Sequence, residues 1–439
     1  MKIIGDRRTI FVERSLQILL LLMPFDLVIA EVEHGLFKDF LPMLSLVLHP
    51  FVIFAVFLIC FKQITVANLK RQSVIVHTAM LMLAITCILH AIQGNMLSLN
   101  YLILGIGALQ LGMLLAMLPD DAQIGIMRVL AIGVWCWCIC IVSVYSVDII
   151  RLVGTYPWMK KYSIDQMVLA IRYPESIGMH IYYPLITGNW NKVANLIVVM
   201  FLFSMIAIYR DMAKRHIYLV AMACMSMVII LSYSRGGILV LAGVSFINLW
   251  LSRRIESDHR GAWVLACVFM LLPLIVSVSF PAMRAGWFDN SSIVERLNQI
   301  TSLAAGTHAA GTHAAGNFNN LIDLLIGKGV GVYGTEYFNN PFAGMHNMFI
   351  DIFLAGGVTQ LLGLIILFTY ALYRVGRRHR RSIEEIIGGV AVLAVVILSF
   401  REFNLNYLGV SAFLSLLLGL LLGEAICVMN RYKNIQKHA

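Results

Sequence analysis

Long apolar stretches separated by short polar segments run along the whole chain. A helix of about 20 apolar residues crosses the hydrocarbon core of a bilayer, so each stretch is a candidate membrane span. The pattern predicts an all-α polytopic membrane protein, in which residues 1–439 form a single integral membrane domain. About twelve spans are expected, near residues 15–30, 41–61, 73–93, 97–118, 127–147, 193–209, 217–233, 238–252, 262–280, 346–372, 386–400 and 407–428.

The composition supports this class. Hydrophobic residues make up 60% of the chain and charged residues 13%, whereas a soluble domain carries roughly 25% charged residues. The net charge of +10 comes from short basic runs between the apolar stretches, so we expect no nucleic-acid partner. All 8 cysteines lie inside apolar stretches, and we interpret them as small residues facing lipid or the core rather than as metal ligands or redox pairs.

The basic residues predict the orientation, because positive charge accumulates in cytoplasmic loops. With twelve helices and both termini in the cytoplasm, seven basic clusters along the chain all fall on the cytoplasmic side. Arg7, Arg8 and Arg14 precede the first apolar run without a small-residue cleavage site, so we expect a retained helix rather than a signal peptide. The clusters are Lys2 to Arg14, Lys62 to Arg71, Arg128, Arg210 to Arg215, Arg253 to Arg260, Arg374 to Arg381 and Arg431 to Lys437.

Two of the remaining, outward connections are long, namely residues 148–192 and 281–345. Loops of this length typically fold over a site rather than merely join helices. A period-five repeat within the second loop, residues 304–316, contains His308 and His313. No other ligand types lie nearby, and we interpret the repeat as a tandem duplication rather than a metal site.

Arg235 is the first candidate functional residue, in the segment SYSRGG at 232–237 directly after an apolar span. A charge at the membrane edge is costly unless it is paired or used. The two glycines predict a break between consecutive helices, with the guanidinium at the mouth of a cavity. The alternative is an arginine that reaches the lipid headgroups, although the departure from the positive-inside trend favours a ligand.

His346 and Asn347 open the expected span 346–372. A histidine at an aqueous–lipid boundary is suited to accept a proton from a hydroxyl group, and Asn347 is expected either to orient a sugar or to cap the helix. An ordinary interfacial helix start is the alternative for the pair.

Three further arginines lie on the outward side. Arginine binds a diphosphate in a bidentate manner and stays charged in partly dry places. Arg172 and Arg296 are therefore candidate diphosphate ligands and Arg401 a supporting residue, although Arg296 can instead pair with Glu295 or Asp289, and Arg401 with Glu402.

Over residues 190–375 the chain resembles the O-antigen ligase and polymerase superfamily of bacterial envelope glycosyltransferases. The resemblance rests on the Ser-Arg-Gly-Gly run at 234–237 after a span, the long loop that ends in IGKGVG at 326–331, and the His-Asn pair at 346–347. Nine residues then separate Asn347 from Gly357.

Two departures leave the choice within this superfamily open. The ligases carry Gly, Thr or Tyr where this chain has Gln360, and one branch of polymerases carries an arginine, ten residues and a glycine in both loops. Here Tyr183 and Thr307 follow Arg172 and Arg296 at that spacing. A ligase is favoured by a small margin.

The resemblance implies a GT-C-like helical protein of the bacterial inner membrane, with both long loops in the periplasm. It would move a glycan from an undecaprenyl-diphosphate-linked donor to a lipid A core, or to a second lipid-linked glycan in a polymerase. His346 would be the general base, Arg235 and, by loop location, Arg172 and Arg296 would hold the diphosphate, and no metal or other cofactor would be required. Membrane lipids are expected partners.

A transporter or lipid-linked glycan flippase is the main rival. One large transporter family carries a Gly…Asp-Arg…Gly-Arg-Arg signature between its second and third spans, whereas residues 62–72 here read KQITVANLKRQ. The two halves of the chain also differ in the placement of their long loops, which disfavours an internal repeat.

Overall fold

The computed structural model describes residues 20–21, 69–70, 72–118, 120–172, 190–255, 257–287, 321–332, 347–376, 383–401, 415–423 and 426. Every regular element in these ranges is a helix, and eight of the helices are long and apolar enough to cross a membrane. A ninth apolar helix, Ile386–Ser399, is shorter. These helices confirm the prediction of an all-α, multi-pass membrane protein.

The count of twelve spans stays a prediction. Apart from residues 20–21, the expected spans 15–30 and 41–61 lie outside the described residues. The last expected span, 407–428, is described at residues 415–423 and 426, which are helical. The contacts divide the chain into two compact units.

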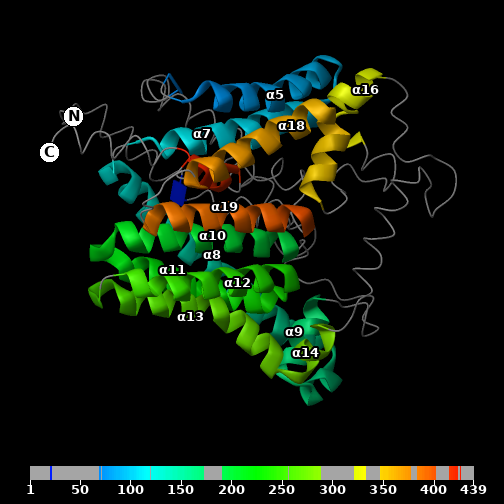
Figure 1. Cartoon of the computed structure of the whole chain (residues 1–439). Coiled ribbons are helices and arrows are strands. Elements are labelled where there is room, and N and C mark those ends of the chain that lie inside the picture. Colours follow the sequence, from blue (N-terminus) through cyan, green and yellow to red (C-terminus); the bar gives the residue numbers. More distant parts are fainter. Residues whose placement is uncertain are drawn as a thin grey trace, which may run out of the picture. The chain divides into compact units, whose positions relative to one another are not determined.

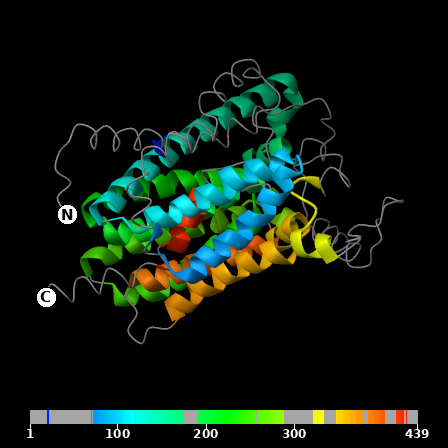
Figure 2. The same ribbon diagram turned by 90° about the horizontal axis from the view of Figure 1, so that it is seen from above.

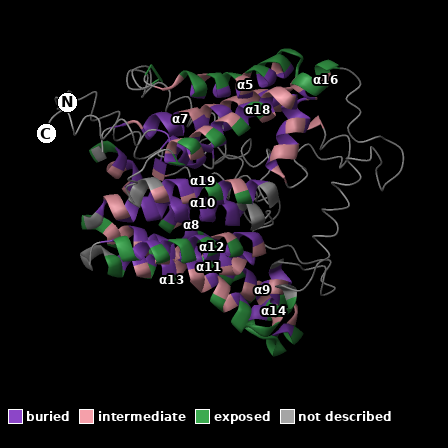
Figure 3. Ribbon diagram, viewed as in Figure 1, coloured by how far each residue is buried: buried purple, intermediate pink, exposed green. Residues whose placement is uncertain are grey.

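The first unit contains the described residues from Leu118 to Trp287. Its helices are α8 (Asp120–Thr155), α9 (Ile164–Arg172), α10 (Trp190–Arg210), α11 (Arg215–Ser232), α12 (Arg235–Leu251), α13 (Ser257–Ser279) and α14 (Pro281–Trp287), with short 3-10 turns at Pro157–Lys161, Met212–Lys214 and Ser252–Arg254. Helix α10 packs against α8, α11, α12 and α13, and it is buried along nearly its whole length (Figure 3). Its sequence is apolar on all sides, as expected of a helix at the centre of a bundle.

Short turns join α10 to α13 in succession, so the ends of these helices alternate between two ends of the unit. The basic turns at Met212–Lys214 and Ser252–Arg254 fall at one end. The α11–α12 turn and the end of α13 fall at the other, where α9 and α14 pack against each other (Figure 1).

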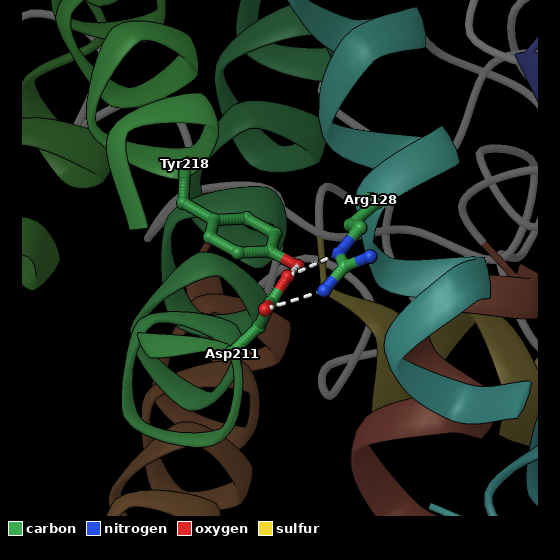
Figure 4. Close-up of polar contacts among 3 residues, drawn as sticks. All are labelled: Arg128, Asp211 and Tyr218. Atoms are coloured by element: carbon green, nitrogen blue, oxygen red, sulfur yellow. Dashed lines mark hydrogen bonds and ion pairs between the residues drawn. The ribbon is translucent and has the colours of Figure 1, made fainter. Parts of the chain in front are cut away.

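An ion pair joins α8 to the α10–α11 turn at the basic end (Figure 4). Arg128 donates through Nε and Nη2 to both carboxylate oxygens of Asp211, the Nη2–Oδ1 distance being 2.7 Å, and the Tyr218 hydroxyl donates to Oδ2 at 2.9 Å. Hydrogen bonding by Arg128 is the main cause that lowers the pKa of Asp211, and it outweighs the opposing effect of burial. The Asp211 carboxylate therefore links α8, the end of α10 and α11.

The second unit contains the described residues 69–117, 321–376 and 388–426. Its helices are α5 (Val74–Ile92), α6 (Met96–Asn100), a π-helix (Tyr101–Gly107), α7 (Ala108–Leu115), α16 (Leu321–Ile326), α18 (Met348–Gly376) and most of α19 (Ile383–Arg401). Helices α5 and α18 lie side by side (Figures 1 and 2).

Helix α7 crosses residues 415–423 at two glycines. A β-carbon added at Gly112 would lie 2.7 Å from the amide nitrogen of Leu420, and one added at Gly419 would lie 3.1 Å from the Cα of Gly112. Two backbones can approach this closely only where both positions lack side chains, a common form of helix packing in membranes.

Candidate functional site

The turn before Arg235 is made by Tyr233, which has the left-handed backbone angles φ 46° and ψ 38°. It is the sole non-glycine residue with positive φ in the described ranges. A side chain in this conformation costs about 1 kcal/mol and persists where the surroundings hold it. Here the ring is buried and its hydroxyl donates to the carbonyl of Met283 in α14.

Gly236 and Gly237 belong to the first turn of α12 and do not form the break that the sequence assigned to them. A β-carbon at Gly237 would lie 3.4 Å from Cγ2 of Val198 and 3.6 Å from Cβ of Ala194, which are ordinary contacts. The prediction of a break between the two spans is confirmed, but the residue responsible is Tyr233.

Arg235 is the first residue of α12 and is half-buried. The preceding Ser234 stands at the N-cap, yet its buried hydroxyl makes no cap hydrogen bond and no other one to the residues described. The positive end of a helix dipole disfavours a cation and attracts an anion. An arginine beside first-turn amides and a buried hydroxyl is therefore a suitable place for a phosphate group.

Helices α9 and α14, which belong to the two long loops expected on the outward side, pack against each other at this end of the first unit. Oδ2 of Asp165 in α9 accepts a hydrogen bond from the amide of Ala282 in α14, at 3.0 Å. At the start of α9 the Ser163 amide donates to Oε1 of Gln166 at 2.9 Å, which is one of the two bonds of a capping box. Burial acts to raise the pKa of Asp165, but the hydrogen bonds from the Ser163 hydroxyl and Ala282 outweigh it and lower the pKa.

Several basic residues at this end were not singled out from the sequence. Arg151 lies 3.3 Å from Asp148 on α8, while Lys160, Lys161 and Arg284 are exposed. The signal for all four was available, because each lies in or next to an expected outward loop and so departs from the positive-inside trend. The rings of Tyr156, Trp158 and Tyr162 stand edge to face among them, as in the aromatic belts of membrane interfaces.

Four of the six predicted site residues are only partly described or not described. The backbone of Arg172 ends α9, and that of Arg401 ends α19, but their side chains lie outside the described set. Arg296 and His346 lie outside the described residues altogether, as does the repeat with His308 and His313. Arg235 belongs to the first unit and Asn347 to the second.

Asn347 caps α18. Its Oδ1 accepts hydrogen bonds from the amides of Phe349 at 3.0 Å and Ile350 at 3.2 Å. Of the two roles expected for Asn347, the geometry supports the helix cap. A role in orienting a sugar would fall to its amide nitrogen.

Helix α18 changes direction at Gly357, where φ is 65° and ψ is −165° (Figure 1). Two carbonyls just before the break accept hydrogen bonds from the glycine-rich segment that follows α16. The amide of Lys328 donates to Leu354 at 3.0 Å, and the amide of Gly329 donates to Ala355 at 2.8 Å. Non-helical backbone at membrane depth requires such substitute partners.

The same segment packs against the break without intervening side chains. A β-carbon at Gly357 would lie 2.5 Å from the carbonyl oxygen of Leu325 and 2.6 Å from the amide nitrogen of Gly327. Gly327, Gly329 and Gly331 all have positive φ, which glycine adopts freely. Two parts of the pattern behind the resemblance, 326–331 and Gly357, thus form one structural element.

The amides of residues 327–330 all donate within the protein, to Asp323, Leu354, Ala355 and the Ser98 hydroxyl. The glycine-rich segment is therefore a packing element and not a phosphate-binding loop, since its donors are already engaged.

Gln360, the departure from the ligase pattern, is completely buried. Its Nε2 donates to the carbonyl of Leu83 at 3.0 Å and lies 3.2 Å from Sγ of Cys87, both in α5. A β-carbon at Gly356 would overlap with the Gln360 side chain. Gln360 therefore joins the second part of α18 to α5.

The comparisons with known proteins do not identify a family, so the resemblance to the O-antigen ligase and polymerase superfamily stays an expectation. A scan of the chain against protein-family models finds no match, and no curated protein matches it. The fold and the site define the class, a multi-pass α-helical membrane protein with a half-buried arginine at a break between two spans.

Proposed function

We propose that this protein is a glycosyltransferase of the bacterial inner membrane that acts at the periplasmic face. It moves a glycan from an undecaprenyl-diphosphate-linked donor to an acceptor sugar hydroxyl, as in an O-antigen ligase with lipid A core as acceptor. The second candidate within the same chemistry is a polymerase that joins lipid-linked repeat units.

The observation that carries the proposal is the setting of Arg235. Arg235 is a half-buried arginine that follows a strained turn at Tyr233, at the N-terminus of a membrane-spanning helix, and the preceding residue, Ser234, has a buried hydroxyl. These groups attract an anion at the membrane edge. A lipid diphosphate is an anion held at that depth by its own tail.

The chemistry follows from these groups and from His346. The acceptor hydroxyl attacks the anomeric carbon as His346 takes its proton, a new glycosidic bond forms, and the bond between the anomeric carbon and the diphosphate oxygen breaks. Negative charge then develops on the leaving diphosphate, where Arg235 stabilises it. A single displacement of this kind inverts the anomeric configuration.

The placement of the helix ends in the first unit supports a site on the periplasmic side of the membrane. Helices α9 and α14, which belong to the two loops expected in the periplasm, lie at the end of the first unit that holds the turn before Arg235. The basic turns at Met212–Lys214 and Ser252–Arg254 lie at the other end, which the positive-inside rule assigns to the cytoplasm.

A transfer assay with purified protein tests the proposal. The protein in detergent receives an undecaprenyl-diphosphate-linked glycan, lipid A core and a chelator. Glycan on lipid A core supports a ligase, and lengthened lipid-linked chains support a polymerase. A protein that leaves both substrates unchanged, but moves lipid-linked glycan across a vesicle membrane, is a flippase and the proposal is wrong.

A further inference from the structure

The first part of α18 is separated from the rest of the helix by the break at Gly357. Within one continuous helix, each carbonyl up to the break would be bonded to an amide four residues later. The carbonyls of Leu354 and Ala355 accept hydrogen bonds from the amides of Lys328 and Gly329, which lie in a different segment of the chain. The direction of residues 348–356 therefore depends on where the glycine-rich segment 327–331 is held.

Residues from the end of α5 and the start of α6 hold that segment. Nε2 of His90 lies 2.9 Å from the carbonyl oxygen of Ile326, and because a carbonyl only accepts, Nε2 carries the proton. Nδ2 of Asn95 donates to the carbonyl of Val330 at 3.1 Å, and Oγ of Ser98 accepts from the Val330 amide at 3.1 Å. These hydrogen bonds hold the segment at Ile326, directly before it, and at Val330, near its end.

Packing adds to the hydrogen bonds. A β-carbon at Gly329 would lie 2.5 Å from Nδ2 of Asn95 and 3.3 Å from Cγ of the His90 ring. His90 is buried, and the segment lies against its ring with no room for a side chain. Such close packing allows only one arrangement of the segment and α5, because a shift of either would cause a steric clash with the other.

We propose that His90 and Asn95 are positioning residues, which hold segment 327–331 against the break in α18 and thereby set the direction of residues 348–356 and of the Asn347 cap. The effect of His90 and Asn95 on the direction of this half-helix concerns the fold and does not depend on the proposed function. Its importance for transfer rests on the proposed function, in which His346, the residue before Asn347, is the base.

Spin labels across the break test the first claim. Cysteines at the partly exposed Ile350 and the exposed Leu362, in a chain without native thiols, report the distance between the two parts of α18. The unaltered segment gives one narrow distribution. His90→Ala and Asn95→Asp broaden or shift it, whereas His90→Gln, which restores an N–H donor, returns it toward the original.

Two features make these variants specific. Asn95→Asp keeps the Oδ1 that accepts from the Ser98 amide at 3.0 Å and begins α6, so it removes the bond to Val330 and not the cap. His77→Ala, which removes a half-buried histidine near the other end of α5, is the matched control and leaves the distribution unchanged. Superimposable distributions for His90→Ala, Asn95→Asp and the parent overturn the proposal.

Transfer kinetics test the second claim. A displaced half-helix lowers kcat by about ten- to hundred-fold with little change in donor KM, because a shift of about 1 Å in a reacting group has effects of this size. His90→Gln regains most of kcat. A changed spin-label distance with unchanged kcat overturns the link to catalysis, while a parent protein without any transfer overturns the proposed function and leaves the distances to decide the positioning claim.

Discussion

Gly357 of α18 and Gly327 of the glycine-rich segment meet backbone to backbone, so that a β-carbon at Gly357 would lie 2.6 Å from the Gly327 amide nitrogen. Gly357→Ala therefore adds both a clash and a strained positive φ. We expect it to destabilise the protein by about 2–3 kcal/mol. Thermal unfolding of the purified protein in detergent measures the loss.

Gly376→Ala is the matched control at the end of the same helix. A β-carbon there would have no neighbour within 4 Å, and Gly376 has no positive φ. Equal unfolding temperatures for Gly357→Ala and Gly376→Ala would contradict the close approach of the segment.

The spans could be predicted because each depends on its own residues. The expected span 217–233 corresponds to α11, Arg215–Ser232, and the expected span 73–93 corresponds to α5, Val74–Ile92. A run of apolar residues of sufficient length is stable in a bilayer whatever its neighbours are. Its position is therefore readable from composition alone.

The details of the candidate site could not be predicted in the same way. The hydropathy pattern of residues 346–372 predicts one continuous span, and the Gly356–Gly357 pair does not by itself predict a break, since glycine is frequent in membrane helices. The break needs the amides of Lys328 and Gly329, which are remote in sequence. Tyr233 was overlooked at the α11–α12 turn because two glycines follow it and tyrosine rarely adopts positive φ.

The Asp211 carboxylate predicts a dependence of stability on pH. Its pKa is lowered below the ordinary value of 3.8 by Arg128, so the stabilisation is complete above about pH 4 and is lost as the pH falls toward the lowered pKa. Asp211→Asn removes the ion pair and should cost about 1–2 kcal/mol at neutral pH.

Thermal unfolding at pH 7, 5 and 3 tests this dependence. The difference between the parent and Asp211→Asn should persist at pH 5 and shrink at pH 3. Asp121→Asn, an exposed carboxylate near the start of α8, should behave as the parent throughout. A difference that grows on acidification has the wrong sign and would exclude the ion pair as its cause.

Arg235→Lys should be nearly as damaging to transfer as Arg235→Ala, each lowering kcat by about a hundred-fold. Lysine keeps the positive charge but loses the planar group that binds a diphosphate through two bonds. The transfer assay with chelator measures both variants, and Lys160→Ala, on an exposed residue of the same end, serves as control. If lysine restores most of the activity, Arg235 supplies charge alone.

His346→Ala should abolish transfer while expression and membrane insertion stay normal. The proposed base accepts the proton of the acceptor hydroxyl, and without it the hydroxyl is a weak nucleophile. Surface polysaccharide in cells and transfer in detergent give two independent measurements. Near-normal polysaccharide in cells that carry His346→Ala would refute the general-base role.

A shared site requires Arg235 and the start of α18 to face the same side of the membrane. Arg235 follows the turn that contacts α14. Asn347 begins α18, whose break contacts the glycine-rich segment, and Asn95, just after α5, donates to that segment. Thr155, Ala285 and Gln93 are exposed at these places. The positive-inside rule assigns all three to the periplasmic side. Cysteines there, in a chain without native thiols, should react with an impermeant maleimide in intact spheroplasts.

A cysteine at the exposed Ala213, in the basic α10–α11 turn, should react only after permeabilisation. The three outward positions sample both units, so their agreement tests whether Arg235 and the start of α18 face the same compartment. If the cysteine at Gln93 were protected while those at Thr155 and Ala285 reacted, the arginine and the proposed base would face opposite compartments. No single displacement joins groups separated by a bilayer, and the glycosyltransferase proposal would then fail.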